Sequence, residues 1–191
     1  MRTGSILSLL ALCTLLFGCG QKSEPLPPPT AESIAAFTEA AFNGNTLVVT
    51  EALKNGMPAN QTNAEGFCAL MAASFNGHVE TIQALIDAGA NVNQTNTQGV
   101  TPLIAACGPY PAAVRLLLEN GAEVNAADKI ESFTALMYAA VEGLSPVCDI
   151  LLEYGADPSM KDDDKDTAAT HAKTGGHLAL ADKLQKLIDE K

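Results

Sequence analysis

The sequence contains no tryptophan, few other aromatic residues and few basic ones. Its 191 residues include 6 Phe and 3 Tyr, and 11 Lys and Arg stand against 22 Asp and Glu, which gives a net charge of −11. Because no basic stripe is present, nucleic acids and anionic lipid headgroups are poor partners, and a basic protein is the better complement. The absence of tryptophan, together with abundant Ala and Leu, is typical of thin helices that pack closely through small residues.

The usual signatures of a catalytic site are also missing. No Ser or Cys has a His and a carboxylate at a spacing known for nucleophilic catalysis, and the sequence has no Gly-rich phosphate-binding loop. We therefore predict that the chain is not an enzyme and needs no cofactor or metal.

A short phrase recurs at a constant interval along the chain. It begins at positions 68, 101, 134 and 167 as Cys-Ala-Leu, Thr-Pro-Leu, Thr-Ala-Leu and Thr-Ala-Ala, and a weaker copy begins at position 35. Between these phrases, apolar residues at three- and four-residue steps predict amphipathic helices. The third unit has lost one residue at 108–111, and the next loop, 127–132, has gained one. A period of this length indicates a stack of similar helical units, and repeat arrays present extended binding surfaces.

The pattern Leu-x-x-Gly-Ala-x-Val-Asn, followed by Gly-x-Thr-Pro-Leu-x-x-Ala-Ala, resembles the ankyrin repeat. The best match is residues 101–106 with 116–125, and the resemblance extends from residue 31 to about 188. It implies an all-α repeat solenoid of about five ankyrin repeats, each a helix–turn–helix plus a β-hairpin finger, stacked in a curved array. The expected repeats are 31–60, 61–93, 94–126, 127–159 and 160–191, with polar caps at the two ends.

Two departures from the family pattern stand out. The family's His after Leu is replaced throughout, which removes the hydrogen bonds that it makes between repeats; the replacements are Met71, Ile104, Met137 and Thr170. The finger glycine of the fifth repeat is Lys165. His78 and His177 follow the turn glycine, where the family uses His to brace the turn.

The N-terminus resembles a bacterial lipoprotein signal. Arg2 precedes an apolar stretch at residues 6–17, and Gly18-Cys19 follows. The resemblance implies a signal peptide at 1–18, lipidation of Cys19, and a Pro-rich linker over the rest of 19–30, ahead of a repeat domain at 31–191. The alternative is an uncleaved anchor, although the apolar stretch is shorter than the roughly 20 residues of a spanning helix.

This reading places the protein in a bacterial cell envelope. Gly20 rather than Asp follows the cysteine, which resembles enterobacterial lipoproteins that are sorted to the outer membrane. This resemblance implies the periplasmic side of the outer membrane if the cell is Gram-negative. Removal of residues 1–18 leaves 10 basic and 22 acidic residues, a net charge of about −12. The linker would hold the array some 30 Å from the bilayer, at about 3.1 Å per residue of polyproline geometry.

Apolar residues recur at two positions that vary in the ankyrin family and line its concave face. We expect them to form an apolar strip across the groove, with Tyr110 nearby; they are Phe42, Phe67, Phe75, Val100, Phe133 and Val141. Acidic residues would form a rim that orients the partner: Glu65, Glu131 and Glu142. The expected energetic anchors are Phe67, Phe75, Phe133 and Tyr110. The alternative is that each ring packs locally against its neighbouring finger.

The acidic run 162–166 invites a calcium-loop interpretation. Such a loop needs Gly at its sixth position and Glu at its twelfth, whereas the chain has Thr167 and Lys173 there, so a solvated acidic fingertip is the better reading. A zinc pair of His171 and His177 would lack a third ligand.

We therefore predict a monomeric, membrane-tethered protein–protein interaction module that binds a partner protein in its concave groove. An inhibitor of a toxin or enzyme, similar to an immunity protein, is the alternative, and a metal-dependent module is a remote third. The cysteines of the mature domain are expected to be small buried hydrophobes, although a disulfide among them is the alternative in an oxidising compartment; they are Cys68, Cys107 and Cys148.

Overall fold

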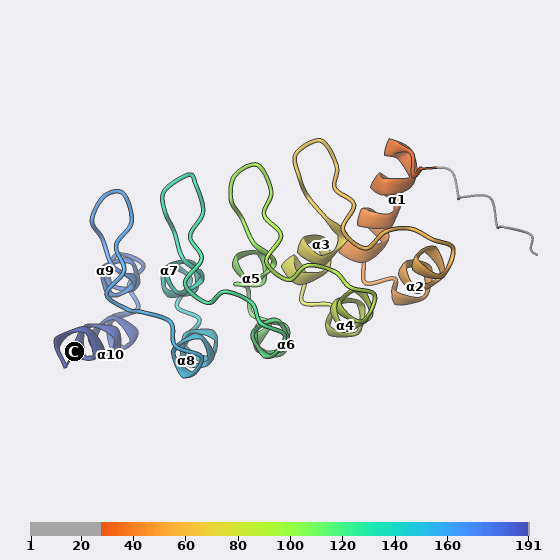
Figure 1. The fold of residues 1–191 in the computed structure, drawn as a ribbon. Helices are drawn as coiled ribbons and strands as arrows, with labels where there is room; N and C mark the ends of the chain where they lie inside the picture. The colour runs from red at the N-terminus through yellow and green to blue at the C-terminus, as the bar shows by residue number, and fades with distance from the viewer. Residues whose placement is uncertain (1–27, 191) are drawn as a thin grey trace, which may run out of the picture.

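The computed structural model describes residues 28–190, which form a linear stack of helix pairs (Figure 1). Inner helices lie in one row: α1 (Ala31–Phe42), α3 (Ala69–Phe75), α5 (Pro102–Ala105), α7 (Ala135–Val141) and α9 (Ala168–Thr174). Outer helices lie in a second row: α2 (Thr46–Lys54), α4 (Val79–Asp87), α6 (Pro111–Glu119), α8 (Ser145–Glu153) and α10 (Leu178–Asp189). Four finger loops extend from the inner row, between consecutive pairs. The predicted all-α repeat solenoid is confirmed.

The recurring phrase marks the start of each inner helix. Thr101 and Thr134 precede α5 and α7, and their hydroxyls accept hydrogen bonds from the backbone N–H three residues on, at 3.2 and 3.4 Å. Such capping satisfies a donor that the first helical turn leaves unpaired. Cys68 takes this position before α3 and makes no side-chain capping bond. The phrase therefore recurs because it starts helices.

One continuous core runs between the two rows of helices. Its largest fully buried side chains are Leu70, Met71, Ile82, Leu85, Leu103, Leu117, Leu136, Met137, Leu151 and Leu184. Alanines fill much of the remaining contact, so the helices approach closely. Cys68, Cys107 and Cys148 are free thiols. The first and third are buried, as predicted for small hydrophobes, whereas Cys107 is only partly buried.

Asparagine side chains connect consecutive repeats. The Asn60 amide donates to the Gly89 carbonyl at 3.0 Å and accepts from the Asn91 N–H at 2.7 Å. Asn93 and Asn125 make the same pair of contacts with the repeat that follows each of them. These bonds connect each repeat to the one that follows it.

The fingers bond to one another at their tips. Backbone N–H groups of Thr97, Lys129 and Asp163 donate to carbonyls of the preceding finger, at 2.8 to 3.1 Å. Within residues 28–190 the fingers form isolated bridges, at Thr62–Cys68 and Ala127–Thr134, and no extended strands. The expected β-hairpin fingers are therefore held by isolated bridges rather than by strand ladders.

The fingertip position shows why the family places glycine there. Gly66 and Gly99 have φ of +80°, and their counterparts Ser132 and Lys165 have φ of +62° and +69°. A side chain in this left-handed region costs roughly 1–2 kcal/mol. The last two fingers are therefore locally strained.

Replacing Lys165 with glycine is expected to stabilise the array. The relief of strain outweighs glycine's entropy cost of about 0.5–1 kcal/mol, which leaves a net gain of about 0.5–1 kcal/mol. Chemical denaturation measures this free energy of unfolding. Lys161→Gly, in the same finger but without positive φ, is the matched control and should lose stability. A loss of stability in both variants would contradict the strain at residue 165.

The predicted signal peptide, Cys19 and most of the linker lie outside the described residues. Across residues 28–190, every helix is too short or too polar to cross a membrane.

Candidate functional site

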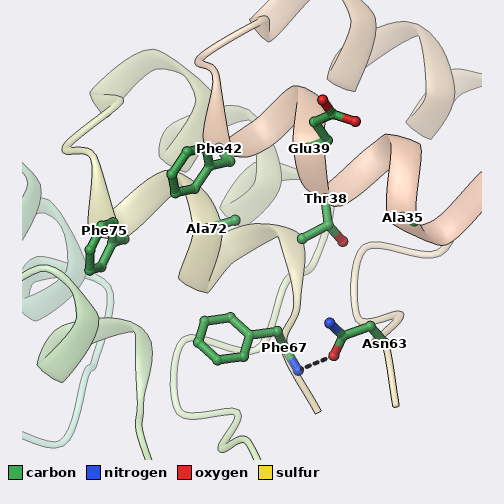
Figure 2. Close-up of a pocket in the computed structure, with 8 residues that line it drawn as sticks. All are labelled: Ala35, Thr38, Glu39, Phe42, Asn63, Phe67, Ala72 and Phe75. Carbon is green, nitrogen blue, oxygen red and sulfur yellow. Dashed lines mark hydrogen bonds between the residues drawn. The ribbon is translucent and has the colours of Figure 1, made fainter. Parts of the chain in front are cut away.

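An apolar hollow opens between the first two repeats, beside the first finger. It has a volume of about 500 Å³, and its walls come from α1, α3 and the finger; they are Ala35, Thr38, Glu39, Phe42, Asn63, Phe67, Ala72 and Phe75. We call this the aromatic pocket. Figure 2 shows Phe42 and Phe75 on one side of it, Phe67 and Asn63 on another, and Ala72 between them. The Glu39 carboxylate lies at the edge away from Phe67.

Two of its phenylalanines are exposed although they touch. Phe42 and Phe75 end successive inner helices and are 44% and 56% exposed. Their ring centroids lie 6.1 Å apart, with an interplanar angle of 19°. Because they are separated by one full period of the repeat, they occupy the same place in successive units. Paired rings left in solvent are what an interface would cover.

The finger holds Phe67 in place. The Asn63 side-chain oxygen accepts hydrogen bonds from the backbone N–H of Glu65 at 3.1 Å and of Phe67 at 2.9 Å. This short-range turn orients the start of α3, so the Phe67 ring, which is half-buried, faces the aromatic pocket.

Phe133 has a different environment from Phe67, although the two are equivalent in the repeat. The Phe133 ring lies 5.3 Å from the Tyr138 ring and 4.6 Å from the His171 ring, between centroids. Two side chains of the protein itself therefore pack against the Phe133 ring. Local packing, which was the alternative for these rings, describes Phe133, while Phe42, Phe67 and Phe75 come together at the opposite end.

Tyr110 lies at the turn rather than in the aromatic pocket. It precedes α6, as His78 precedes α4, and its ring covers Gly77, where an added Cβ would lie 2.2 Å from the ring. The loss of one residue at 108–111 shifts Tyr110 into the place that His78 takes in the repeat before.

The predicted turn-bracing histidines are confirmed. The Nε2 atoms of His78 and His177 lie 2.9 and 3.1 Å from the carbonyls of Phe42 and Val141, in the preceding repeats. Neither histidine is arranged as a metal ligand. Within residues 28–190, no group of three or more His, Cys, Asp or Glu side chains could hold a metal ion.

The remaining predicted contact residues are spread along the array. Val100 and Val141 are half-buried, while the side chains of Glu65, Glu131 and Glu142 are exposed. Glu65 and Glu131 are at fingertips, and Glu142 ends α7. None of these five lines the aromatic pocket, so the predicted strip is a cluster at one end with scattered residues beyond it.

The acidic finger 162–166 is built around an internal bond. Asp162 is buried, and its carboxylate accepts from the Asp166 N–H at 2.9 Å and pairs with His171 Nε2 at 2.6 Å. Burial raises the pKa of this carboxyl, but these hydrogen bonds and the facing His171 outweigh burial and leave the pKa below its usual range. The Asp162 carboxylate is used by these internal contacts, so its role is structural.

The thiols are also unsuited to catalysis. Burial raises the pKa of Cys148 to about 12, and burial raises the pKa of Cys107 further. Both stay protonated at neutral pH, whereas a nucleophilic cysteine requires the thiolate.

Sequence reasoning missed Ala72, Asn63 and Glu39 as members of the site. The available signal was a comparison of equivalent positions, because residues 72 and 105 are Ala where 138 and 171 carry rings. A small residue at one repeat and a large one at another predicts a cavity.

Comparison with known proteins identifies the type of repeat. A family model described as "Ankyrin repeats (3 copies)" matches residues 37–128 and 90–162. The glycerophosphocholine phosphodiesterase gde1 of Schizosaccharomyces pombe is 40% identical over 78 residues, and the ankyrin repeat protein nuc-2 of Neurospora crassa is 39% identical over 74 residues. These matches cover 41% and 39% of this chain but only 7% of each relative. The phosphodiesterase activity in the first name therefore says nothing about this chain.

Proposed function

The chain belongs to the ankyrin repeat family, and we propose that it is a protein-binding module that holds a partner against its inner helices and fingers. Ankyrin repeats generally mediate protein–protein interaction and are typically non-catalytic. The observation that carries the proposal is the exposed, stacked pair Phe42 and Phe75 beside an open apolar pocket. Covering such rings releases apolar area from water, at roughly 25 cal/mol per Å².

The acid-rich composition supports a basic partner. The net charge of −11 would draw a basic protein toward the array and repel acidic ones. Exposed Glu65 and Glu131 extend this charge along the fingertips. In this proposal the rings provide affinity, and the carboxylates provide orientation and association rate.

We further propose that the module is tethered to a membrane of a bacterial envelope through lipidated Cys19 and works as a monomer facing the periplasm. The sequence of residues 1–20 supports this part of the proposal. Globomycin, which blocks lipoprotein signal cleavage, should cause an unprocessed precursor to accumulate if Cys19 is lipidated, and Cys19→Ala should prevent that response.

A crosslinking pull-down from the native envelope tests the partner-binding function. Phe42→Glu/Phe75→Glu puts two charges into the expected contact, so it should lose at least about tenfold in partner capture, corresponding to about 1.4 kcal/mol or more. Leu47→Glu/Val48→Glu is the matched control, because these residues are 85% and 54% exposed on outer helix α2.

Capture by the wild type and the control, but not by the pocket variant, supports the proposal. Equal capture by all three proteins would contradict it by moving the contact to another face. If the captured partner is an enzyme, its activity with and without the array decides between a tether and an immunity-like inhibitor.

A further inference from the structure

The aromatic pocket lies where two other repeats carry aromatic side chains of their own. From one repeat to the next, one inner-helix position is occupied in turn by Glu39, Ala72, Ala105, Tyr138 and His171. The last two carry rings, the middle two carry only a methyl group, and the first carries a carboxylate. The same place in the fold is therefore filled at the C-terminal end and open at the N-terminal end.

At the C-terminal end, each of the two rings is held by a polar contact with an Asp as well as by packing against Phe133. Tyr138 donates its hydroxyl hydrogen to Asp128 Oδ2 at 2.7 Å, and His171 Nε2 lies 2.6 Å from Asp162 Oδ2. Both rings pack against Phe133. In these two fingers, the Asp that begins the finger thus pairs through its Oδ2 with the polar atom of the ring.

At the N-terminal end, alanines replace both rings and asparagines replace both aspartates. Phe67 corresponds to Phe133, and the residues corresponding to its two ring neighbours are Ala72, in its own repeat, and Ala105, in the next. The finger residue is Asn63, whose oxygen is used by the backbone of its own turn. The pocket of about 500 Å³ lies beside Phe67 on the side of Ala72 and α1, and Ala105 is not among the residues that line it.

A buried polar atom adjoins the pocket. The side-chain oxygen of Thr38 is buried and has no hydrogen-bond partner within residues 28–190. An unsatisfied buried hydroxyl is unfavourable. Rotation of the Thr38 side chain toward the pocket would let a polar group of a ligand satisfy it. Tyrosine and tryptophan combine a ring with such a group.

The charge around the pocket has one sign. Residues 31–114 contain a single Lys or Arg, at Lys54, and six acidic residues: Glu32, Glu39, Glu51, Glu65, Glu80 and Asp87. Glu39 lies in the pocket wall itself. An anionic ligand would meet repulsion here, and a cation beside the bound ring would be attracted.

We propose that the aromatic pocket binds a tyrosine or tryptophan side chain of a partner that is followed directly by lysine or arginine. The partner's ring takes the place beside Phe67, Phe42 and Phe75 that Tyr138 takes beside Phe133, and its cation lies near Glu39. This inference rests on the proposed function, since it specifies the segment of the partner that is recognised.

The absence of tryptophan from the protein allows a direct test. The probe is the N-acetylated peptide Gly-Ser-Trp-Arg-Ser-Gly, whose indole is the only one in solution, and its emission should shift to the blue and saturate as protein is added. The matched peptide with Glu in place of Arg should bind at least about tenfold more weakly. The peptide with Ala in place of Trp should fail to compete.

Two variants locate the binding. Ala72→Tyr places in this pocket the side chain that fills the fourth repeat, and it should abolish the emission shift. Glu39→Gln changes only an exposed charge and should reduce the preference for Arg over Glu without changing the melting temperature. Together they remain informative even if the larger side chain disturbs the fold.

An emission shift that survives Ala72→Tyr in a folded protein, or equal binding of the Arg and Glu peptides, would overturn the inference. An envelope partner captured through Phe42 and Phe75 but unaffected by Ala72→Tyr would also overturn it while leaving the proposed function intact. Probe binding that Ala72→Tyr abolishes supports the pocket even if no envelope protein depends on Phe42 and Phe75, an outcome that would remove only the broader function.

Discussion

Gly77→Ala is expected to destabilise the array by about 2–4 kcal/mol, since it combines two costs. Gly77 has φ of +67°, a conformation that costs an L-residue roughly 1–2 kcal/mol. The new Cβ would also lie 2.2 Å from Cγ of the Tyr110 ring, so the ring or the turn must move. Thermal and denaturant unfolding of the purified domain measure the loss.

Gly89→Ala separates the two costs. Gly89 has φ of +83°, but its Cβ would meet nothing within 4 Å, so this variant should lose only the conformational part. Tyr110→Ala in the Gly77→Ala background should recover the clash part, which a double-mutant cycle reports as a coupling energy. Equal losses for Gly77→Ala and Gly89→Ala would show that Tyr110 does not pack on the turn.

Asp128→Ala is expected to cost about 2–4 kcal/mol, because it removes the acceptor for several donors at once. The buried carboxylate accepts from the backbone N–H of residues 130, 131 and 133 and from the Tyr138 hydroxyl. Asp128→Asn keeps an oxygen for the backbone, as Asn63 and Asn96 do in earlier fingers, and should lose less than half as much. Urea unfolding at pH 7 compares the three proteins. An Asn variant as unstable as the Ala variant would contradict the dominance of the backbone bonds.

The same carboxylate makes stability depend on pH. Burial raises the pKa of Asp128, but hydrogen bonds from Tyr138 and the finger backbone outweigh it and hold the pKa below its usual range. A lowered pKa stabilises the fold above the unfolded-state value of about 3.9, and this contribution is lost as pH falls through the folded value. Asp162 acts in the same direction. Asp128→Asn should therefore show a shallower loss of stability in acid than the wild type.

The repeat register made most of the fold predictable. The constant period, the helix caps and the turn glycines are local features, so they located the helix pairs without tertiary information. The roles of His78 and His177 came from the resemblance to the ankyrin family. The same reasoning placed Phe67 and Phe133 in one class because they are equivalent in sequence. Their difference lies in what packs against them, at residues 72, 105, 138 and 171.

Tyr110 shows a second limit of pattern reading. The deletion at 108–111 was visible in the sequence, but a ring beside a turn resembles a binding residue. Only the contact with Gly77 shows that the tyrosine replaces a histidine. Insertions and deletions therefore reassign a side chain's role even where the flanking register is conserved.

The connections between repeats have a consequence for how the aromatic pocket would operate. Fingertip bonds, asparagine clamps and helix contacts join neighbours along the stack, so detachment of the first repeat leaves the others intact. The aromatic pocket is divided between α1 and the second repeat, and it ceases to exist when α1 separates from α3. The apparent affinity is then the intrinsic affinity reduced by the fraction of molecules whose end is closed. Fraying of one terminal unit, rather than cooperative unfolding of the array, sets how much binding-competent protein is present.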